Sequence, residues 1–240
     1  MQFLKNFFQV GGSLNGITHC SDYDDAADWS DCNVYALKTN EGLILFDSGN
    51  GETLSQIFMN LEYWSLDPNS IAACLVTHPH LDHAGGCHEL NRRGVKVYAH
   101  EYTADAMASG DERCCGYLYH KPFIPCNTDV LLKDGDITTI CGIEIEALHL
   151  PGHTMGCTAY RFHQEGKEIL VSGDVIGTLL SGFFGWNGSF DFDKKAYLST
   201  LARLAQYRPD IMLPGHGLIY YGNPQSRVES ALNHALMEWR

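Results

Sequence analysis

Five short apolar runs in this chain each end at a turn that carries an aspartate or a histidine. Short apolar runs bounded by glycine or proline are typical of buried strands. Strands that share a sheet can bring the side chains after their C-terminal ends to one edge, where α/β proteins usually place their chemistry. The pattern therefore predicts an α/β fold with a polar site at one sheet edge. The runs are 43–46, 71–77, 143–150, 169–173 and 211–214.

Amphipathic segments predict helices that cover these strands. Residues 194–207 and 225–239 place apolar side chains at helical spacing, with Asp191 or Asp193 as a start signal for the first and Pro224 before the second. Weaker helix candidates are 52–63, 82–92 and 101–109. We expect the two strong helices to pack on a sheet through their apolar faces.

Length and composition predict one domain that spans residues 1–240. The chain has 240 residues, of which 45% are hydrophobic, so it can bury a full core and is not mainly disordered. Segment 101–126 mixes charged, cysteine and aromatic residues and is expected to be an insertion. The acidic segment 22–31 is expected to be a solvated loop.

Charge and the N-terminal sequence argue against two classes of partner. The formal net charge is −13 and the sequence has no Lys/Arg-rich run, so nucleic acid is not an expected partner. Lys5, Asn6 and Gln9 interrupt the apolar residues at the start of the chain, which leaves neither a secretory segment nor a spanning helix there. We therefore expect a cytoplasmic protein without a membrane partner.

The nine cysteines predict free thiols, because their number is odd and the chain lacks an export signal. Cys114, Cys115 and Cys126 lie close together in the sequence and could bind a metal or respond to redox state. Their spacing matches no zinc pattern, so buried thiols are the favoured interpretation.

The most specific chemical signal is the hexapeptide His78-Pro-His-Leu-Asp-His83. His78 and His80 are alternate residues at a strand end and can direct two imidazoles towards one cation, while the proline between them delays helix formation. Asp82 and His83 begin the next turn. Four metal-binding groups within six residues cannot all bind one tetrahedral ion together with ligands from other strands, so a second cation is expected nearby.

Three distant residues complete the predicted site. His153, Asp174 and His216 each follow a predicted strand and each lies beside a glycine, which lets the backbone turn close to an ion. Any one of them alone would be an ordinary turn residue. Together with the hexapeptide they give seven candidate ligands, a number that suits two metal ions.

With these motifs in order, the chain resembles the metallo-β-lactamase superfamily from about Asn33 to His216. The resemblance implies an αβ/βα sandwich, in which two mixed sheets are flanked by helices and the metals lie at one edge between the sheets. It also implies that Asp47 braces the site without binding metal. The motifs that carry it are Phe46-Asp-Ser-Gly49, Thr77-His-Pro-His-Leu-Asp-His-Ala-Gly-Gly86, Leu150-Pro-Gly-His-Thr154, Val171-Ser-Gly-Asp174 and Leu213-Pro-Gly-His-Gly217.

The resemblance further assigns the ligands. It implies that metal one is held by His78, His80 and His153, that metal two is held by Asp82, His83 and His216, and that Asp174 bridges both. Imidazole and carboxylate ligands suit zinc and also accept iron or manganese. The predicted cofactors are therefore two divalent ions, with zinc favoured.

The predicted reaction is hydrolysis of a small-molecule carboxylic ester, lactone or thioester by a metal-bound hydroxide. Asp82 and Asp174 are the expected catalytic residues, and Asp82 would orient the hydroxide. Glutathione thioesterases of this superfamily carry an added C-terminal helical domain, whereas this chain ends soon after His216, so a glutathione thioester is not favoured.

Two other functions stay open at this point. One is a mononuclear iron dioxygenase acting on a persulfide, although the Arg-rich segment of those relatives is replaced here by 175–186. The other is a non-catalytic metal-binding scaffold, which an intact set of seven ligands disfavours.

Aromatic residues near the predicted site have two possible roles. Those in segment 183–190 could form an apolar wall over the metals, or a core or homodimer contact. Four residues of the expected insertion either contact substrate or face solvent, and these are Arg113, Tyr117, Tyr119 and His120.

Overall fold

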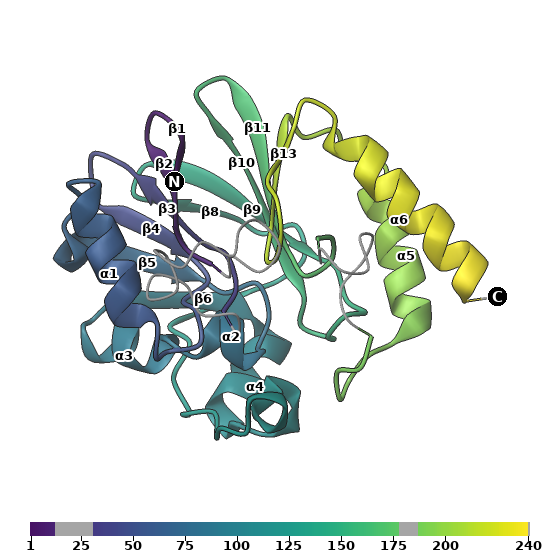
Figure 1. Ribbon diagram of the computed structural model, residues 1–240, viewed down its shortest axis with the longest axis horizontal. Helices are drawn as coiled ribbons and strands as arrows, with labels where there is room; N and C mark the ends of the chain where they lie inside the picture. The colour runs from purple at the N-terminus through teal and green to yellow at the C-terminus, as the bar shows by residue number, and fades with distance from the viewer. Residues whose placement is uncertain (13–30, 178–186, 240) are drawn as a thin grey trace, which may run out of the picture.

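Two β-sheets packed face to face, with helices on both outer faces, make up the computed structural model, which describes residues 1–12, 31–177 and 187–239 (Figure 1). Both sheets are mixed, because each contains parallel and antiparallel strand pairs. This arrangement confirms the predicted αβ/βα sandwich. No helix in the described residues is both long enough and apolar enough to span a membrane.

The first sheet contains the N-terminal strands and the strand that precedes the hexapeptide. Its strands follow the order of the sequence: β1 (Gln2–Leu4), β2 (Phe7–Gly11), β3 (Val34–Lys38), β4 (Leu43–Phe46), β5 (Ile71–Leu75), β6 (Lys96–His100) and β7 (Val130–Leu132). Strands β1 to β4 pair antiparallel, and β4 to β7 pair parallel. Parallel neighbours need crossovers, which contain α1 (Leu54–Tyr63), α2 (Leu81–Ala84), α3 (Cys87–Arg92) and α4 (Glu101–Ser109).

The second sheet has the order β13-β12-β11-β10-β9-β8. Its strands are β8 (Ile137–Ile140), β9 (Ile143–His149), β10 (Thr158–Gln164), β11 (Lys167–Gly173), β12 (Ile211–Pro214) and β13 (Tyr220–Tyr221). Only β11 and β12 among them pair parallel, and α5 (Lys194–Leu204) lies in their crossover. Helix α6 (Pro224–Glu238) packs beside α5 on the outer face of this sheet (Figure 1).

Three apolar layers hold the sandwich together. The side chains of β4 are all buried, because Ile44 and Phe46 point into the layer between the sheets while Leu43 and Leu45 point towards the helices. In the central layer, the rings of Phe46 and Phe162 stack with centroids 5.3 Å apart. The third layer lies between the second sheet and helices α5 and α6.

All five predicted strands are present, and the predicted helices are present with one correction. Segment 82–92 is not one helix, because Gly85 and Gly86 separate α2 from α3. A Cβ at Gly85 would collide with the backbone carbonyls of Leu81 and Asn50, so this break lies where two backbone segments pass very close together. Of the two possible start residues for α5, Asp193 is the one that caps the helix, accepting a hydrogen bond from the Ala196 amide at 2.7 Å.

Segment 101–126 packs against the first sheet. After α4 it forms two 3₁₀ helices, Glu112–Cys114 and Gly116–Tyr119, and a third 3₁₀ helix, Pro68–Ser70, precedes β5. Met107, Cys114 and Phe123 are buried in the layer beneath the first sheet. Residues 22–30 and 183–186, for which a loop and an aromatic wall were predicted, lie outside the described residues.

Candidate metal centre

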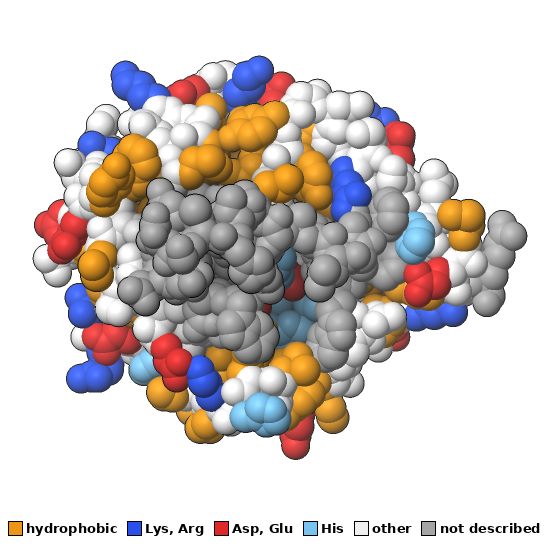
Figure 2. Space-filling view, viewed as in Figure 1, with side chains coloured by type: hydrophobic (Ala, Val, Ile, Leu, Met, Phe, Trp, Pro, Cys, Tyr) orange, Lys and Arg blue, Asp and Glu red, His pale blue; other side chains and the backbone are white. Residues whose placement is uncertain are grey.

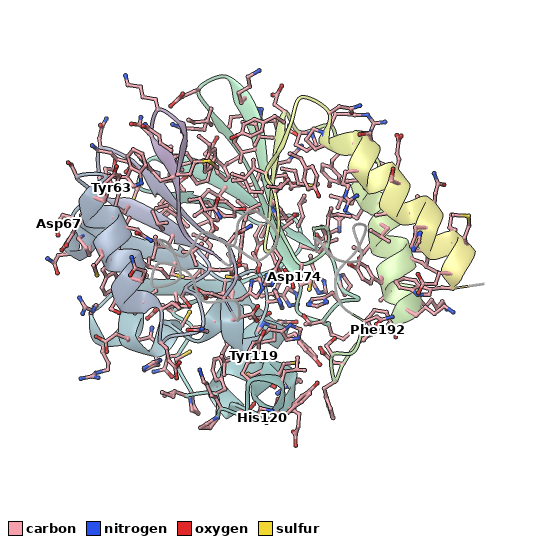
Figure 3. All side chains as sticks on the ribbon, viewed as in Figure 1. Tyr63, Asp67, Tyr119, His120, Asp174 and Phe192 are labelled. Carbon is pink, nitrogen blue, oxygen red and sulfur yellow. The ribbon has the colours of Figure 1, made fainter. Side chains whose placement is uncertain are left out.

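The seven predicted ligands converge at one edge between the two sheets. They lie in turns that follow β5, β9, β11 and β12, or on the short helix α2. Figure 3 shows Asp174 among nitrogen-bearing side chains between the sheets, close to the middle of the molecule. Six of the seven side chains are buried, and the seventh, His216, is 25% exposed. The structure therefore brings together every residue that the sequence singled out for this site.

Three histidines form the first group. The ligand nitrogens of His78, His80 and His153 all lie within 4.8 Å of one another. Within it, His153 Nε2 and His80 Nδ1 are 3.2 Å apart. His78 and His80 come from the turn after β5 and His153 from the turn after β9, so each sheet contributes to the group.

The second group contains one carboxylate and two imidazoles. Asp82 and His83 are neighbours on α2, and His216 follows β12. His216 Nε2 lies 3.0 Å from Asp82 Oδ2 and 3.3 Å from His83 Nε2. One ligand atom from each of these three residues lies within 4.8 Å of the other two, close enough for all three to bind one ion.

The Asp174 carboxylate lies between the two groups. Its Oδ2 atom is 3.5 Å from His153 Nε2 in the first group and 3.5 Å from His216 Nε2 in the second. Its Oδ1 atom is 3.4 Å from His83 Nε2. One carboxylate can therefore reach both groups of ligands.

Polar atoms in the site show that the residues fit metal ions. His78 Nε2 and Asp174 Oδ1 are buried and have no hydrogen-bond partner among the described residues. Buried polar atoms are normally hydrogen-bonded, because leaving them unpaired is costly. A cation between the groups would satisfy them, and neutral imidazoles with carboxylates are a suitable donor set for zinc and its neighbours in the periodic table.

Protonation favours cation binding at the first group and opposes it at the second, where nearby acidic groups outweigh burial and raise the pKa values of His83 and His216, so an ion must displace their protons. Burial and the neighbouring imidazoles hold the pKa values of His78 and His80 well below the ordinary value, so both rings are neutral and keep a lone pair. Burial alone would raise the pKa of Asp82, but His83 and His216 lower it to about 2. The pKa of Asp174 is also lowered, because the same histidines outweigh its burial. Both carboxylates are therefore ionised at neutral pH.

Asp47 braces the second group from behind. Its Oδ2 atom lies 2.8 Å from His83 Nδ1, and its carboxylate accepts hydrogen bonds from the Thr77 amide at 2.7 Å and the Thr77 hydroxyl at 2.8 Å. With a proton on His83 Nδ1 directed at Asp47, the Nε2 lone pair of His83 faces Asp82 and Asp174. The Asp47 backbone is left-handed, with φ 61°, a conformation that an aspartate tolerates better than most residues.

Gly215 makes room for the site. A Cβ at this position would overlap Asp174 Oδ1 and the His83 ring. Because any side chain at Gly215 would meet these atoms, only glycine lets the turn after β12 approach α2 this closely. The sequence indicated a flexible turn at this glycine, and the structure shows that close packing is the stronger reason.

Several neighbours of the site carry no sequence motif. The Cys32 thiol lies within 4.8 Å of ligand atoms of Asp47 and His83, and burial raises the pKa of this thiol well above the ordinary value, so it is protonated. The Ser189 hydroxyl donates a hydrogen bond to the His153 carbonyl. The Tyr119 phenol lies close enough to Asp82 that burial together with the Asp82 charge raises its pKa. Sequence reasoning missed Cys32 and Ser189, since their contacts join distant segments.

The cysteine prediction is confirmed for the described residues. Eight cysteines in that part of the chain are free. Cys114, Cys115 and Cys126 are buried, and none of them belongs to a possible metal-binding group of described residues.

Comparison with known proteins agrees with this geometry. A family model described as the metallo-beta-lactamase superfamily matches residues 27–216. Hydroxyacylglutathione hydrolase GloC of Haemophilus influenzae is 30% identical over 219 residues, covering 83% of this chain and 95% of that protein. Atrochrysone carboxyl ACP thioesterase of Aspergillus fumigatus is 27% identical over 203 residues, covering 84% of this chain.

Coverage of the relatives differs. The matched region spans 55% of the Aspergillus protein and 64% of an uncharacterized protein of Aquifex aeolicus. The Haemophilus protein, in contrast, is matched over nearly its whole length. The expectation that a glutathione thioesterase carries an added C-terminal domain is therefore wrong for that relative, and the length of this chain is no argument against such a substrate.

A solved structure shows the same fold. The metallo-β-lactamase of Cronobacter sakazakii with a HARLDQ motif superimposes with a TM-score of 0.76, covering 100% of this chain and 96% of that one. Its sequence identity is 20%, so the likeness concerns the fold alone.

Proposed function

The chain belongs to the metallo-β-lactamase superfamily, and from that premise we propose that it is a metal-dependent hydrolase of a small-molecule acyl substrate, first of all a thioester. Carboxylic esters and lactones are the next candidates, because hydrolysis of all three begins with attack of water on an acyl carbon. A cytoplasmic location belongs to the same proposal.

One observation carries the proposal: two buried groups of ligands share one carboxylate. His78, His80 and His153 would hold one ion, Asp82, His83 and His216 would hold another, and Asp174 reaches both. The favoured pair is two zinc ions, and iron or manganese would fit the same donors. When bound, such ions polarise a carbonyl and make a nucleophile available from water at neutral pH.

The protein's own residues would prepare the site for that chemistry. Asp47 fixes the orientation of the His83 ring through the 2.8 Å contact at Nδ1. The ionised Asp82 carboxylate would accept a hydrogen bond from the attacking water and so orient it. Burial of these groups keeps bulk water out, which strengthens their interaction with charge that develops on the acyl oxygen.

The names of two relatives favour a thioester. Hydroxyacylglutathione hydrolase and an acyl carrier protein thioesterase both act, by name, on acyl groups bonded to sulfur. Their identities to this chain are 30% and 27%, so their names support the reaction class and leave the individual substrate open.

The proposal is tested by a matched substrate panel. One acyl group is presented as a thioester, an oxygen ester and a lactone to the zinc-loaded protein, to Asp174→Asn and to Asp67→Asn. Asp67 is an exposed carboxylate far from Asp174 (Figure 3), so it controls for loss of charge alone.

We expect the thioester to be cleaved fastest, with Asp174→Asn at least about 100-fold slower and Asp67→Asn unchanged. Failure of all three substrates with two ions bound would overturn the proposal. Oxygen uptake with a persulfide would support the iron dioxygenase in its place.

A further inference from the structure

Three aromatic side chains beside the candidate metal centre are not used by the proposed chemistry. We call Tyr117, Tyr119 and Phe190 the aromatic rim. Phe190 is 67% exposed and Tyr117 is 48% exposed, whereas Tyr119 packs partly against the buried layer beneath the first sheet. Isolated exposed aromatic residues are common on protein surfaces. These three, however, lie beside the candidate metal ligands, where a substrate would contact them.

One side of the rim is fixed to the turn that carries His153. Phe190 lies between Ser189, whose hydroxyl donates to the His153 carbonyl, and Asp191, whose Oδ2 accepts from the Met155 amide at 2.8 Å. Hydrogen bonds on both sides therefore hold the backbone of Phe190 next to the first group of ligands.

The other side of the rim reaches the second group of ligands. Tyr117 and Tyr119 lie on the 3₁₀ helix Gly116–Tyr119, which is bracketed by left-handed residues at Cys115 and His120. The Tyr119 phenol lies near enough to Asp82 to feel the charge of that carboxylate. In Figure 3, Tyr119 lies between Asp174 and helix α4.

Cys115 joins the two sides of the rim. Its thiol donates to the Tyr117 hydroxyl at 3.6 Å and lies close to the backbone of Phe190. The two exposed aromatic residues are therefore neighbours across this buried thiol. Figure 2 shows histidine and acidic side chains at the centre of this face, with hydrophobic side chains below them.

The arginine and the lysine of the segment that carries Tyr117 and Tyr119 are already neutralised. Arg113 forms ion pairs with Asp105 at 2.8 Å and Asp111 at 2.7 Å, and Lys121 forms one with Glu52 at 2.5 Å. The whole chain carries a net charge of −13. An anionic acyl group would therefore find no unpaired cation in this segment and would meet the negative charge of the chain, while an uncharged apolar group would gain contact area on the aromatic rings.

We propose that the aromatic rim binds an uncharged, apolar acyl chain of the substrate, and that the length of this chain determines specificity. This inference rests on the proposed hydrolase function, and it deepens that function by naming the class of acyl group. Most of a substrate pocket is apolar, with a few polar groups that fix orientation, and the rim would supply the apolar part here.

The test uses thioesters of N-acetylcysteamine with acetyl, butanoyl, hexanoyl and octanoyl groups, which differ only in chain length. Burial of a methylene group would raise kcat/KM by about two- to fourfold for each carbon that contacts the rim. The double variant Tyr117→Ser/Phe190→Ser should reduce the octanoyl-to-acetyl ratio of kcat/KM about tenfold or more. Tyr63→Ser, an exposed tyrosine far from Asp174 in Figure 3, should keep the ratio.

Binding gives a second readout that is independent of turnover. Thioethers that carry an S-ethyl or S-octyl group on the same small thiol cannot be hydrolysed, and calorimetry measures their affinity directly. We expect the S-octyl compound to bind at least about tenfold more tightly than the S-ethyl compound, and the double variant to lose that difference.

The possible results distinguish failure of the aromatic-rim proposal from failure of the hydrolase proposal. Acetyl thioester turnover without chain-length dependence overturns the rim and leaves the hydrolase intact. Preference for S-octyl binding without hydrolysis of any thioester overturns the hydrolase and supports the rim. Chain-length dependence that persists in Tyr117→Ser/Phe190→Ser shows that other residues bind the acyl chain, and also overturns the rim.

Discussion

Replacing Asp47 by asparagine should weaken metal binding without unfolding the protein. Asparagine adopts left-handed backbone as readily as aspartate, so the φ of 61° at this position stays accessible. Its amide oxygen can still accept the Thr77 amide hydrogen. The side-chain NH₂ would then face the His83 Nδ1–H, and two donors cannot pair.

The His83 ring would respond by moving its proton or by turning away. A proton on Nε2 would remove the lone pair that faces Asp82 and Asp174. Loss of such a supporting carboxylate typically costs 10- to 100-fold in metal affinity, or about 1.4–2.7 kcal/mol. We expect that loss at the second ion, since Asp47 hydrogen-bonds to His83 and makes no such bond to the three histidines of the first group.

Stability of the metal-free protein should change much less than metal affinity. Burial raises the pKa of Asp47 above its ordinary value, despite the opposing effects of His83 and Thr77, so its charged form is costly at neutral pH. A neutral asparagine removes that cost but leaves the buried His83 Nδ1–H without an acceptor, so the free energy of unfolding should change by no more than about 1–2 kcal/mol.

A zinc titration against a chromophoric chelator measures both sites, and urea unfolding of the metal-free protein measures stability. Asp67→Asn is the matched control. Two zinc ions bound by Asp47→Asn with the affinity of the original protein would refute the reasoning.

Two further predictions follow from close packing and from a buried histidine. Gly215→Ala should lose at least one ion per chain and lower the unfolding free energy by about 1–3 kcal/mol, because the added Cβ meets Asp174 and His83; unchanged metal content by elemental analysis would contradict this. Burial and the stacked His149 ring, 3.9 Å away, lower the pKa of His100 to about 4, although Glu101 and Asp134 oppose them. The folded state disfavours protonation of His100, so the free energy of unfolding is highest above pH ~6.5, where the ring is neutral in both states. It falls as the pH drops towards 4, by ~1 kcal/mol between pH 7 and 5 after solvent screening. His100→Asn keeps an acceptor for the Tyr102 amide, so urea unfolding of this variant should show a smaller dependence on pH, and an equal dependence would exclude His100 as the cause.

The site was largely predictable because its ligands sit at strand ends. A run such as 169–173 is recognisable locally, and the aspartate after it lies at the sheet edge whatever the rest of the chain does. The spacing from His78 to His83 likewise shows how one turn and one short helix direct four ligands inward.

The remaining features depend on contacts between distant segments. The break between α2 and α3 reflects close passage of the Asn50 backbone, 35 positions before Gly85, which no local pattern reveals. The N-terminal strands β1 and β2 join a sheet edge through pairing with β3, and their short sequences carry no strong period. The position of Tyr119 beside Asp82 follows from the packing of segment 101–126 on the first sheet.

The most direct test of the central claim is the metal content per chain of protein purified without added metal or chelator, determined by elemental mass spectrometry. The account predicts two divalent ions per chain, with zinc favoured, fewer than two in Asp174→Asn, and two in Asp67→Asn. A single iron per chain, or no more than one ion even after incubation with excess zinc, would contradict it.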